Sequence, residues 1–137
     1  MNTEKRKIII AGDDEKLLET LYSTFESDFE VFLAKDEKEA YEIFFQIRPS
    51  LIITSFKMNI MDGINLTKKI KMLSPSTIVY SICSEKETIE QSAEGGPDKI
   101  FAENDSSLFN EVCKSLDNYS AINSSQFPLK IEIQLEA

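Results

Sequence analysis

Two adjacent carboxylates, Asp13 and Asp14, are the first side chains in this sequence that could take part in chemistry. They follow a run of apolar residues, and carboxylates so placed can hold a divalent cation such as Mg²⁺. They could equally cap the start of a helix, where a carboxylate accepts backbone N–H groups and is favoured by the positive end of the helix dipole. Both interpretations remain open from the sequence.

Ser55 and Cys83 are candidate nucleophiles, and each ends an apolar run. The chain has no histidine, which removes the most common general base and the most common metal ligand together. A serine hydroxyl needs a base before it can attack, so Ser55 is better explained as a small residue that closes a strand. No cation lies next to Cys83 in the sequence to favour its thiolate, so we expect an inert core thiol.

Composition excludes several classes of function. The chain has 137 residues and a net charge of −9, and its longest uninterrupted basic run is only Lys5-Arg6-Lys7, so we expect no direct binding of nucleic acid. Cys83 and Cys113 are too few and too far apart for a disulfide framework or a zinc site, which fits a reducing, cytoplasmic compartment. No run approaches the ~18 apolar residues of a membrane span, and the charged start does not resemble a signal peptide.

The apolar pattern predicts an α/β fold, because short apolar runs alternate with segments of helical periodicity. The expected strands lie near residues 7–11, 29–34, 51–55, 77–82 and 99–102. Continuous apolar runs indicate strands that are covered on both faces, so we predict a doubly wound, five-stranded parallel sheet with helices on both sides. Ligands of such folds bind beyond the carboxyl ends of the strands, where Ser55, Cys83 and Ala102 are expected.

Local signals predict where some helices and turns begin. Asp36 followed by Glu39 is typical of a capping box, in which two side chains and two backbone N–H groups pair reciprocally. Ser84 with Glu87 is a second candidate of the same kind. The segment Met61-Asp62-Gly63 is interpreted as a turn.

A central segment resembles a known signalling family. Residues 49–63 read PSLIITSFKMNIMDG, and they are similar, without a gap, to the central motif of response regulator receiver domains. The resemblance covers about residues 7–116. It implies a flavodoxin-like (CheY-like) three-layer sandwich with strand order 2-1-3-4-5.

The positions that carry receiver chemistry depart from the family pattern. The resemblance places Ser55 at the phosphoacceptor aspartate, Cys83 at the strand-4 Thr or Ser, Ala102 at the strand-5 lysine and Lys99 at the switch aromatic. An ungapped alignment places Gly12 and Asp13 at the acidic pair, whereas a shift by one residue places Asp13 and Asp14 there. The sequence does not decide between these two alignments.

These departures bear on the chemistry of the pocket. In the family, three carboxylates hold Mg²⁺ and a lysine pairs with the incoming phosphoryl group, so transfer depends on an electrostatic clamp. Here the acid and lysine positions are neutral together, and Asp13 and Asp14 alone would bind Mg²⁺ weakly. We therefore expect a pseudo-receiver without catalytic residues or a cofactor, which acts through protein contacts in a two-component pathway. The alternative is a conventional phosphoreceiver that accepts phosphate from a histidine kinase and uses Mg²⁺.

The C-terminal part has a different pattern. Residues 1–116 are predicted to form the receiver-like domain, and the polar residues 117–126 a linker. In residues 127–137, apolar side chains alternate with polar ones, which predicts an additional strand. That strand could begin an output domain, lie on an edge of its own sheet, or pair with the same segment of a second copy in a homodimer. Partner surfaces in the family imply a contact face at about residues 85–116.

Overall fold

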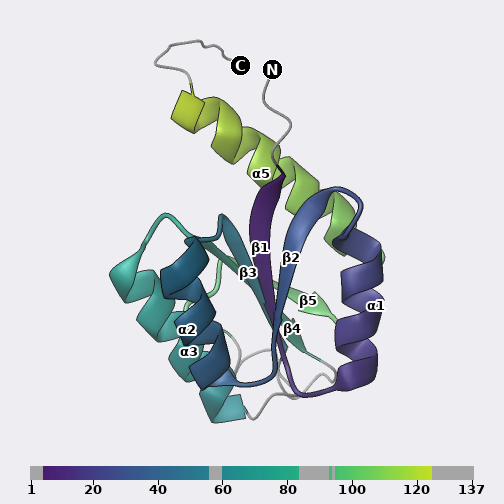
Figure 1. Cartoon of the computed structure of the whole chain (residues 1–137), viewed down its shortest axis with the longest axis vertical. Coiled ribbons are helices and arrows are strands. Elements are labelled where there is room, and N and C mark those ends of the chain that lie inside the picture. The colour runs from purple at the N-terminus through teal and green to yellow at the C-terminus, as the bar shows by residue number, and fades with distance from the viewer. Residues whose placement is uncertain (1–4, 56–59, 84–92, 94, 125–137) are drawn as a thin grey trace. The chain divides into compact units, whose positions relative to one another are not determined.

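The computed structural model describes residues 5–55, 60–83, 93 and 95–124 of the chain. These residues form two compact units, divided between Asp105 and Ser106. The first unit contains all the described strands and three helices, and the second contains helix α5 (Leu108–Ser124) (Figure 1). No helix within the described ranges combines the length and the hydropathy needed to cross a membrane.

The first unit is built on a parallel sheet of five strands. The strands are β1 (Arg6–Ala11), β2 (Phe29–Ala34), β3 (Leu51–Ser55), β4 (Ile78–Cys83) and β5 (Lys99–Ala102). Their order is β2-β1-β3-β4-β5, and every neighbouring pair is parallel. The predicted fold and strand order are therefore confirmed, and each strand begins and ends within one residue of its predicted bounds.

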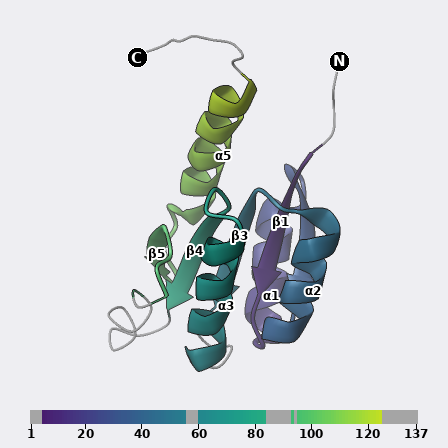
Figure 2. The ribbon, with the colours of Figure 1, turned by 90° about the vertical axis from the view of Figure 1, so that its left-hand side faces the viewer.

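Helices cover both faces of this sheet, as the continuous apolar strands predicted. Helix α1 (Glu15–Phe25) lies on one face, and α2 (Glu37–Ile47) and α3 (Ile60–Leu73) lie on the other (Figures 1 and 2). The core on the α2 and α3 side includes Ile9, Ile52 and Val79, which are fully buried. Because Ile8 and Ile10 are also fully buried, β1 has no solvent-facing side in its second half.

Aspartates begin two of the helices. Asp14 is the N-cap of α1, and its Oδ1 accepts hydrogen bonds from the backbone N–H groups of Lys16 at 3.1 Å and Leu17 at 3.2 Å. Asp36 is the N-cap of α2, and its Oδ1 accepts from the Glu39 N–H at 2.8 Å. The Asp36 cap is therefore confirmed, but the Glu39 carboxylate accepts from the backbone N–H of Lys35 at 2.8 Å, one residue before the position that a capping box requires.

Two local predictions are wrong. Met61-Asp62-Gly63 is not a turn but part of the first turn of α3, because burial of residues such as Ile64 and Ile70 outweighs the Asp-Gly turn signal. The predicted linker of residues 117–126 is helical up to Ser124, since α5 continues through its polar residues, whose helix propensities are only modestly below those of good helix formers. The second capping box, at Ser84 and Glu87, and the predicted strand of the tail lie outside the described residues.

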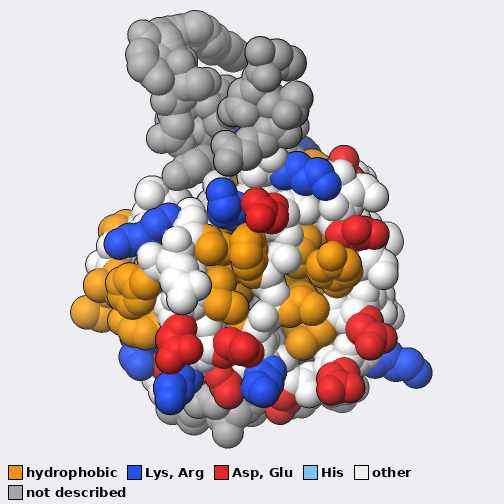
Figure 3. Space-filling view, in the orientation of Figure 1, with side chains coloured by type: hydrophobic (Ala, Val, Ile, Leu, Met, Phe, Trp, Pro, Cys, Tyr) orange, Lys and Arg blue, Asp and Glu red, His pale blue; other side chains and the backbone are white. Residues whose placement is uncertain are grey.

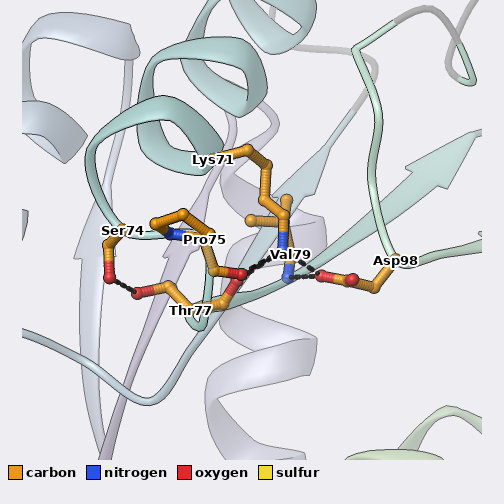
Figure 4. A network of polar contacts seen from close by, with 6 residues as sticks. All are labelled: Lys71, Ser74, Pro75, Thr77, Val79 and Asp98. Carbon is orange, nitrogen blue, oxygen red and sulfur yellow. Dashed lines mark hydrogen bonds and ion pairs between the residues drawn. The ribbon is translucent and has the colours of Figure 1, made fainter.

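A network of polar contacts fixes β5 beside β4 (Figure 4). The Asp98 N–H donates to the Val79 carbonyl at 2.7 Å, and the Val79 N–H donates to Asp98 Oδ2 at 2.8 Å. The Lys71 ammonium, at the end of α3, donates to the same carboxylate at 2.9 Å and to the carbonyls of Pro75 and Thr77 at 3.1 and 2.9 Å. One ion pair therefore joins α3, the start of β4 and the start of β5.

Removing the Asp98 carboxylate should weaken the fold. We expect Asp98→Ala to lower the free energy of unfolding by about 1–3 kcal/mol, because the Val79 N–H and the Lys71 ammonium both lose an acceptor. Urea denaturation followed by circular dichroism measures this. Asp28→Ala is the matched control, since Asp28 is exposed and the change in net charge is the same, and we expect an effect within about 0.5 kcal/mol. Equal effects of the two variants would contradict the role given to Asp98.

Candidate functional site

The candidate site lies where the parallel strands end. Parallel pairing aligns Ala11 with Thr54, Ser55 with Ile82, and Cys83 with Ala102. The carboxyl ends of β1, β3, β4 and β5 therefore meet at one edge of the sheet, which brings the predicted positions to neighbouring strand ends. This is the edge at which α/β proteins bind ligands.

The ends of β1 and β3 approach each other very closely. A Cβ atom placed on Gly12 would lie 2.8 Å from the Ser55 Cβ, 3.4 Å from its Oγ and 3.7 Å from a methyl group of Leu18. Ser55 itself is 1% exposed. Gly96 is the only described glycine with positive φ, so Gly12 is required by the lack of space and not by its backbone conformation. No side chain of any kind fits between these two strand ends without a shift.

Asp13 and Asp14, the two predicted acidic residues, have different environments in the structure. Asp14 caps α1, so the capping interpretation of this residue is confirmed. Asp13 is exposed. The residue beside Ser55 is Gly12, which is the arrangement that an ungapped alignment with the family pattern gives. Of the residues predicted for the acidic pair, Gly12 is therefore the one that the structure shows beside Ser55.

Cys83 lies in an apolar environment at the end of β4. Its side chain is 3% exposed and belongs to a small core cluster with Ile64, against which Ile100 packs. The thiol donates a long contact of 3.8 Å to the Phe101 carbonyl. A buried thiol of this kind packs as a small apolar group, which is the role that the sequence predicted for it.

The end of β5 offers no cation. Ala102 stands beside Cys83 in the register and is exposed, and Glu103 follows it. Lys99, at the switch-aromatic position, begins β5 opposite Tyr80 and is exposed. It therefore lies at the opposite end of the strand from Ala102, so Lys99 cannot replace a lysine at position 102 without a rearrangement of β5.

The described residues do not fit a magnesium site of the receiver kind. Such a site needs several oxygen ligands, usually with one or two carboxylates next to the phosphoryl group. Positions 12 and 55 carry no carboxylate, and the Asp14 carboxylate accepts two backbone N–H groups. In the part of the chain that the structure describes, no three His, Cys, Asp or Glu residues come together as a metal cluster would require.

Sequence reasoning missed one polar pair beneath the site. The hydroxyls of Thr54 and Ser81 lie 3.1 Å apart and are buried, one residue below Ser55 on β3 and two below Cys83 on β4. One hydroxyl donates to the other, so this hydrogen bond uses one of the two O–H donors of the pair. The sequence signal was a Thr and a Ser inside otherwise apolar strands, but their pairing depends on the register of β3 with β4.

Comparison with known proteins identifies a family. The model of the response regulator receiver domain matches residues 8–102. A curated relative, the protein-glutamate methylesterase/protein-glutamine glutaminase of Methanococcus maripaludis, is 35% identical over 78 residues, which is 55% of this chain. The chain covers only 21% of that relative, so the match is to a part of it.

Solved structures share the fold. The signal receiver domain of an HD domain-containing protein from Pseudomonas fluorescens Pf-5 aligns with a TM-score of 0.76 and 19% identity, over 85% of this chain and 98% of that one. A receiver domain protein from Clostridium thermocellum aligns with a TM-score of 0.74 and 18% identity, over 85% and 98%. A two-component response regulator from Clostridium difficile aligns with a TM-score of 0.71 and 22% identity, over 88% and 100%.

Because Gly12 and Ser55 are in contact, substitutions at these two positions should have non-additive effects on the free energy of unfolding. Gly12→Ala should lower the free energy of unfolding by about 1–3 kcal/mol, because its Cβ overpacks against Ser55. In a Ser55→Gly background, which removes the opposing side chain, the same change should be neutral or stabilising by up to about 1 kcal/mol. A double-mutant cycle by urea denaturation measures the difference. Additive effects would mean that the two residues do not touch.

A carboxylate at position 55 should make stability depend on pH. Burial disfavours the charged form, so the pKa of the carboxyl in Ser55→Asp rises above its unfolded value of about 4. A raised acid pKa means that stability is lost as pH rises from the unfolded value through the folded value. We expect Ser55→Asp to be much less stable than the isosteric Ser55→Asn at pH 7 and similar to it near pH 4. Unfolding curves that differ equally at both pH values would contradict this.

Proposed function

Because the chain belongs to the response regulator receiver domain family, we propose that it acts as a two-component signalling module through protein–protein contacts, without aspartyl phosphorylation. The observation that carries this proposal is the close approach of Gly12 to Ser55. This approach means that the ends of β1 and β3 pack against each other at the position where the family pattern has an acidic pocket.

The chemistry of Ser55 supports the proposal. Its hydroxyl is buried, and the chain has no histidine that could serve as the base that an un-ionised hydroxyl needs. A phosphoryl group carries its charge on its equatorial oxygens, and transfer depends on cations and hydrogen-bond donors that are already in place. The methyl group of Ala102 and the buried thiol of Cys83 cannot supply that charge compensation.

The neutrality of the site is consistent across several strands. A lysine at the end of β5 without acids on β1 and β3 would be a partly buried and unpaired charge, which is destabilising. Gly12, Ser55 and Ala102 are all uncharged, so no such charge remains. This pattern favours a site that has lost its phosphorylation chemistry as a whole over a working pocket with one altered residue.

The proposed role is to recruit a partner or to control an attached output domain, in the cytoplasm and without catalysis of its own. In the family, the contact surface would lie at about residues 85–116. Within that range the structure describes β5, which begins with the exposed Lys99, and the first part of α5. Residues 84–92 lie outside the described residues, so this surface stays a proposal by family resemblance.

The conventional phosphoreceiver is the alternative function. It would accept phosphate from a histidine kinase with the help of Mg²⁺. The Mg²⁺ ion would need oxygen ligands beyond those that the described residues bring together. The carboxylates of Asp13 and Asp14 are the remaining acids near the end of β1, and the second of them caps α1.

Incubation with a small-molecule phosphodonor separates the two functions. We expect acetyl phosphate with Mg²⁺ to leave the intact mass of the chain unchanged, because Ser55 has neither a carboxylate nor a base. Electrospray mass spectrometry under mild conditions detects the gain of one phosphoryl group. A conventional receiver treated in parallel serves as the positive control for the donor.

Two outcomes would contradict the proposal. A stable gain that maps to Ser55 would show that the buried hydroxyl is phosphorylated. A labile gain that maps to Asp13 or Asp14 would show that a carboxylate of the β1 end has taken over as acceptor. Either result would favour the conventional phosphoreceiver.

A further inference from the structure

The exposed side of helix α2 carries an aromatic ring next to a cation. Figure 3 shows hydrophobic side chains beside charged ones over the part of the molecule where Figure 1 draws α2 and α3. Phe45 is 46% exposed, although its ring is in edge contact with Tyr41 and Phe44, at 5.0 and 5.4 Å between ring centroids. The guanidinium of Arg48, the C-cap residue, lies 5.6 Å from the ring centroids of Phe44 and Phe45. These contacts restrict the side chains of Phe45 and Arg48, so a partner would meet them with little loss of side-chain entropy.

Charges of opposite sign flank Phe45 on this side of α2. Glu42 precedes Phe45 by three residues and Arg48 follows it by three, and both are exposed. Residues three apart are neighbours on a helix surface, and the contact of Arg48 with the Phe45 ring places the cation beside that ring. Glu42, Phe45 and Arg48 together are called the α2 surface. It presents a carboxylate, a ring and a guanidinium in that order.

The α2 surface is complementary to the same surface of a second, antiparallel copy. Across a twofold axis at Phe45, ring meets ring, and the carboxylate of each copy faces the guanidinium of the other. Because the axis exchanges the two copies, it forms both ion pairs at once. A second α2 that ran parallel in the same register would instead set Glu42 against Glu42 and Arg48 against Arg48, which like charges disfavour.

The other charged side chains that the structure describes on α2 and α3 are compatible with this arrangement. Those already engaged within the chain are the Lys69–Glu37 ion pair at 2.7 Å, the Lys71–Asp98 ion pair at 2.9 Å, and Glu39, which accepts from the backbone N–H of Lys35. Lys38 lies about two turns before Phe45, so an antiparallel copy centred on Phe45 places it beyond the end of the other α2. Lys68 lies about 100° around α3 from Lys69, which pairs with α2, so it lies away from the seam between the two helices.

We propose that two copies of this chain associate through their α2 surfaces, antiparallel across a twofold axis at Phe45. The association removes an exposed aromatic ring of each copy from water, which favours it, and the two ion pairs fix its direction and register. All three residues lie in the first unit, so the contact requires nothing of the position of α5. It also does not depend on whether the receiver site accepts a phosphoryl group.

Sedimentation velocity of the full chain over a range of concentrations measures the association and its Kd. We expect a two-chain particle, and we expect Phe45→Ser to raise the Kd at least about tenfold, because the ring at the centre of the contact is lost. Tyr22→Ser is the matched control, since Tyr22 is an aromatic side chain of similar exposure, 41%, on α1 at the opposite face of the sheet. This control should leave the Kd unchanged. Far-ultraviolet circular dichroism checks that each variant folds.

Charge reversal tests which groups face each other. Glu42→Arg sets two cations against each other at both symmetric contacts, and Arg48→Glu sets two carboxylates against each other, so each variant alone should sediment as one chain. An equimolar mixture of the two variants should form a two-chain particle. In that particle the new arginine of one copy faces the new glutamate of the other, and the unchanged Arg48 and Glu42 also face each other. Glu19→Arg, an equal change of charge at an exposed position of α1, is the matched control and should associate as the unmodified chain does.

Three outcomes would overturn the proposal. A one-chain mass of the unmodified chain at every concentration up to about 1 mM would mean that the α2 surface does not bind a second copy, and would leave it to a different protein. A two-chain particle that Phe45→Ser and the charge reversals leave unchanged would mean that the copies meet elsewhere. Folded charge-reversal variants that stay separate when mixed would mean that Glu42 and Arg48 do not face each other.

Discussion

The distance between the ends of β1 and β3 is the constraint on which the candidate site depends. A Cβ atom at Gly12 would lie 2.8 Å from the Cβ of Ser55, which is well inside ordinary van der Waals contact. Interiors are packed as densely as organic crystals, so such a position cannot accept a larger side chain unless its surroundings shift. Ser55 is 1% exposed at this contact, and Asp14, two residues after Gly12, is the N-cap of α1.

Packing holds the strand ends around this contact in the part of the chain that the structure describes. Ile8, Ile9 and Ile10 are fully buried on β1, and Cys83 packs with Ile64 at the end of β4. The ionic contact that joins strands in this half of the sheet, between Lys71 and Asp98, lies at the opposite ends of β4 and β5. Gly12, Ser55 and Ala102 are uncharged, so no repulsion between carboxylates at these three positions has to be relieved by a bound cation.

Physical causes explain which features could be predicted from the sequence. Continuous apolar runs gave the strands to within one residue, because a strand buried on both faces must be apolar throughout, and Asp36 with Glu39 predicted a cap that depends only on local geometry. Met61-Asp62-Gly63 was mistaken for a turn because tertiary packing of α3 overrides a local signal. The alignment placed Ser55 at the phosphoacceptor position, but the closeness of Gly12 is set by how the two strands end in space, which no local pattern contains.

Titration of the full chain with beryllofluoride and Mg²⁺, followed by NMR, tests most directly whether this receiver has lost its phosphoryl site. Beryllofluoride mimics a phosphoryl group on an acceptor carboxylate, so binding would report the pocket without any covalent step. We expect no saturable shift of the amide signals of Gly12, Ser55, Cys83 or Ala102 at concentrations that saturate a conventional receiver. Saturable, Mg²⁺-dependent shifts at these strand ends would mean that a working phosphoryl pocket exists despite the contact between Gly12 and Ser55.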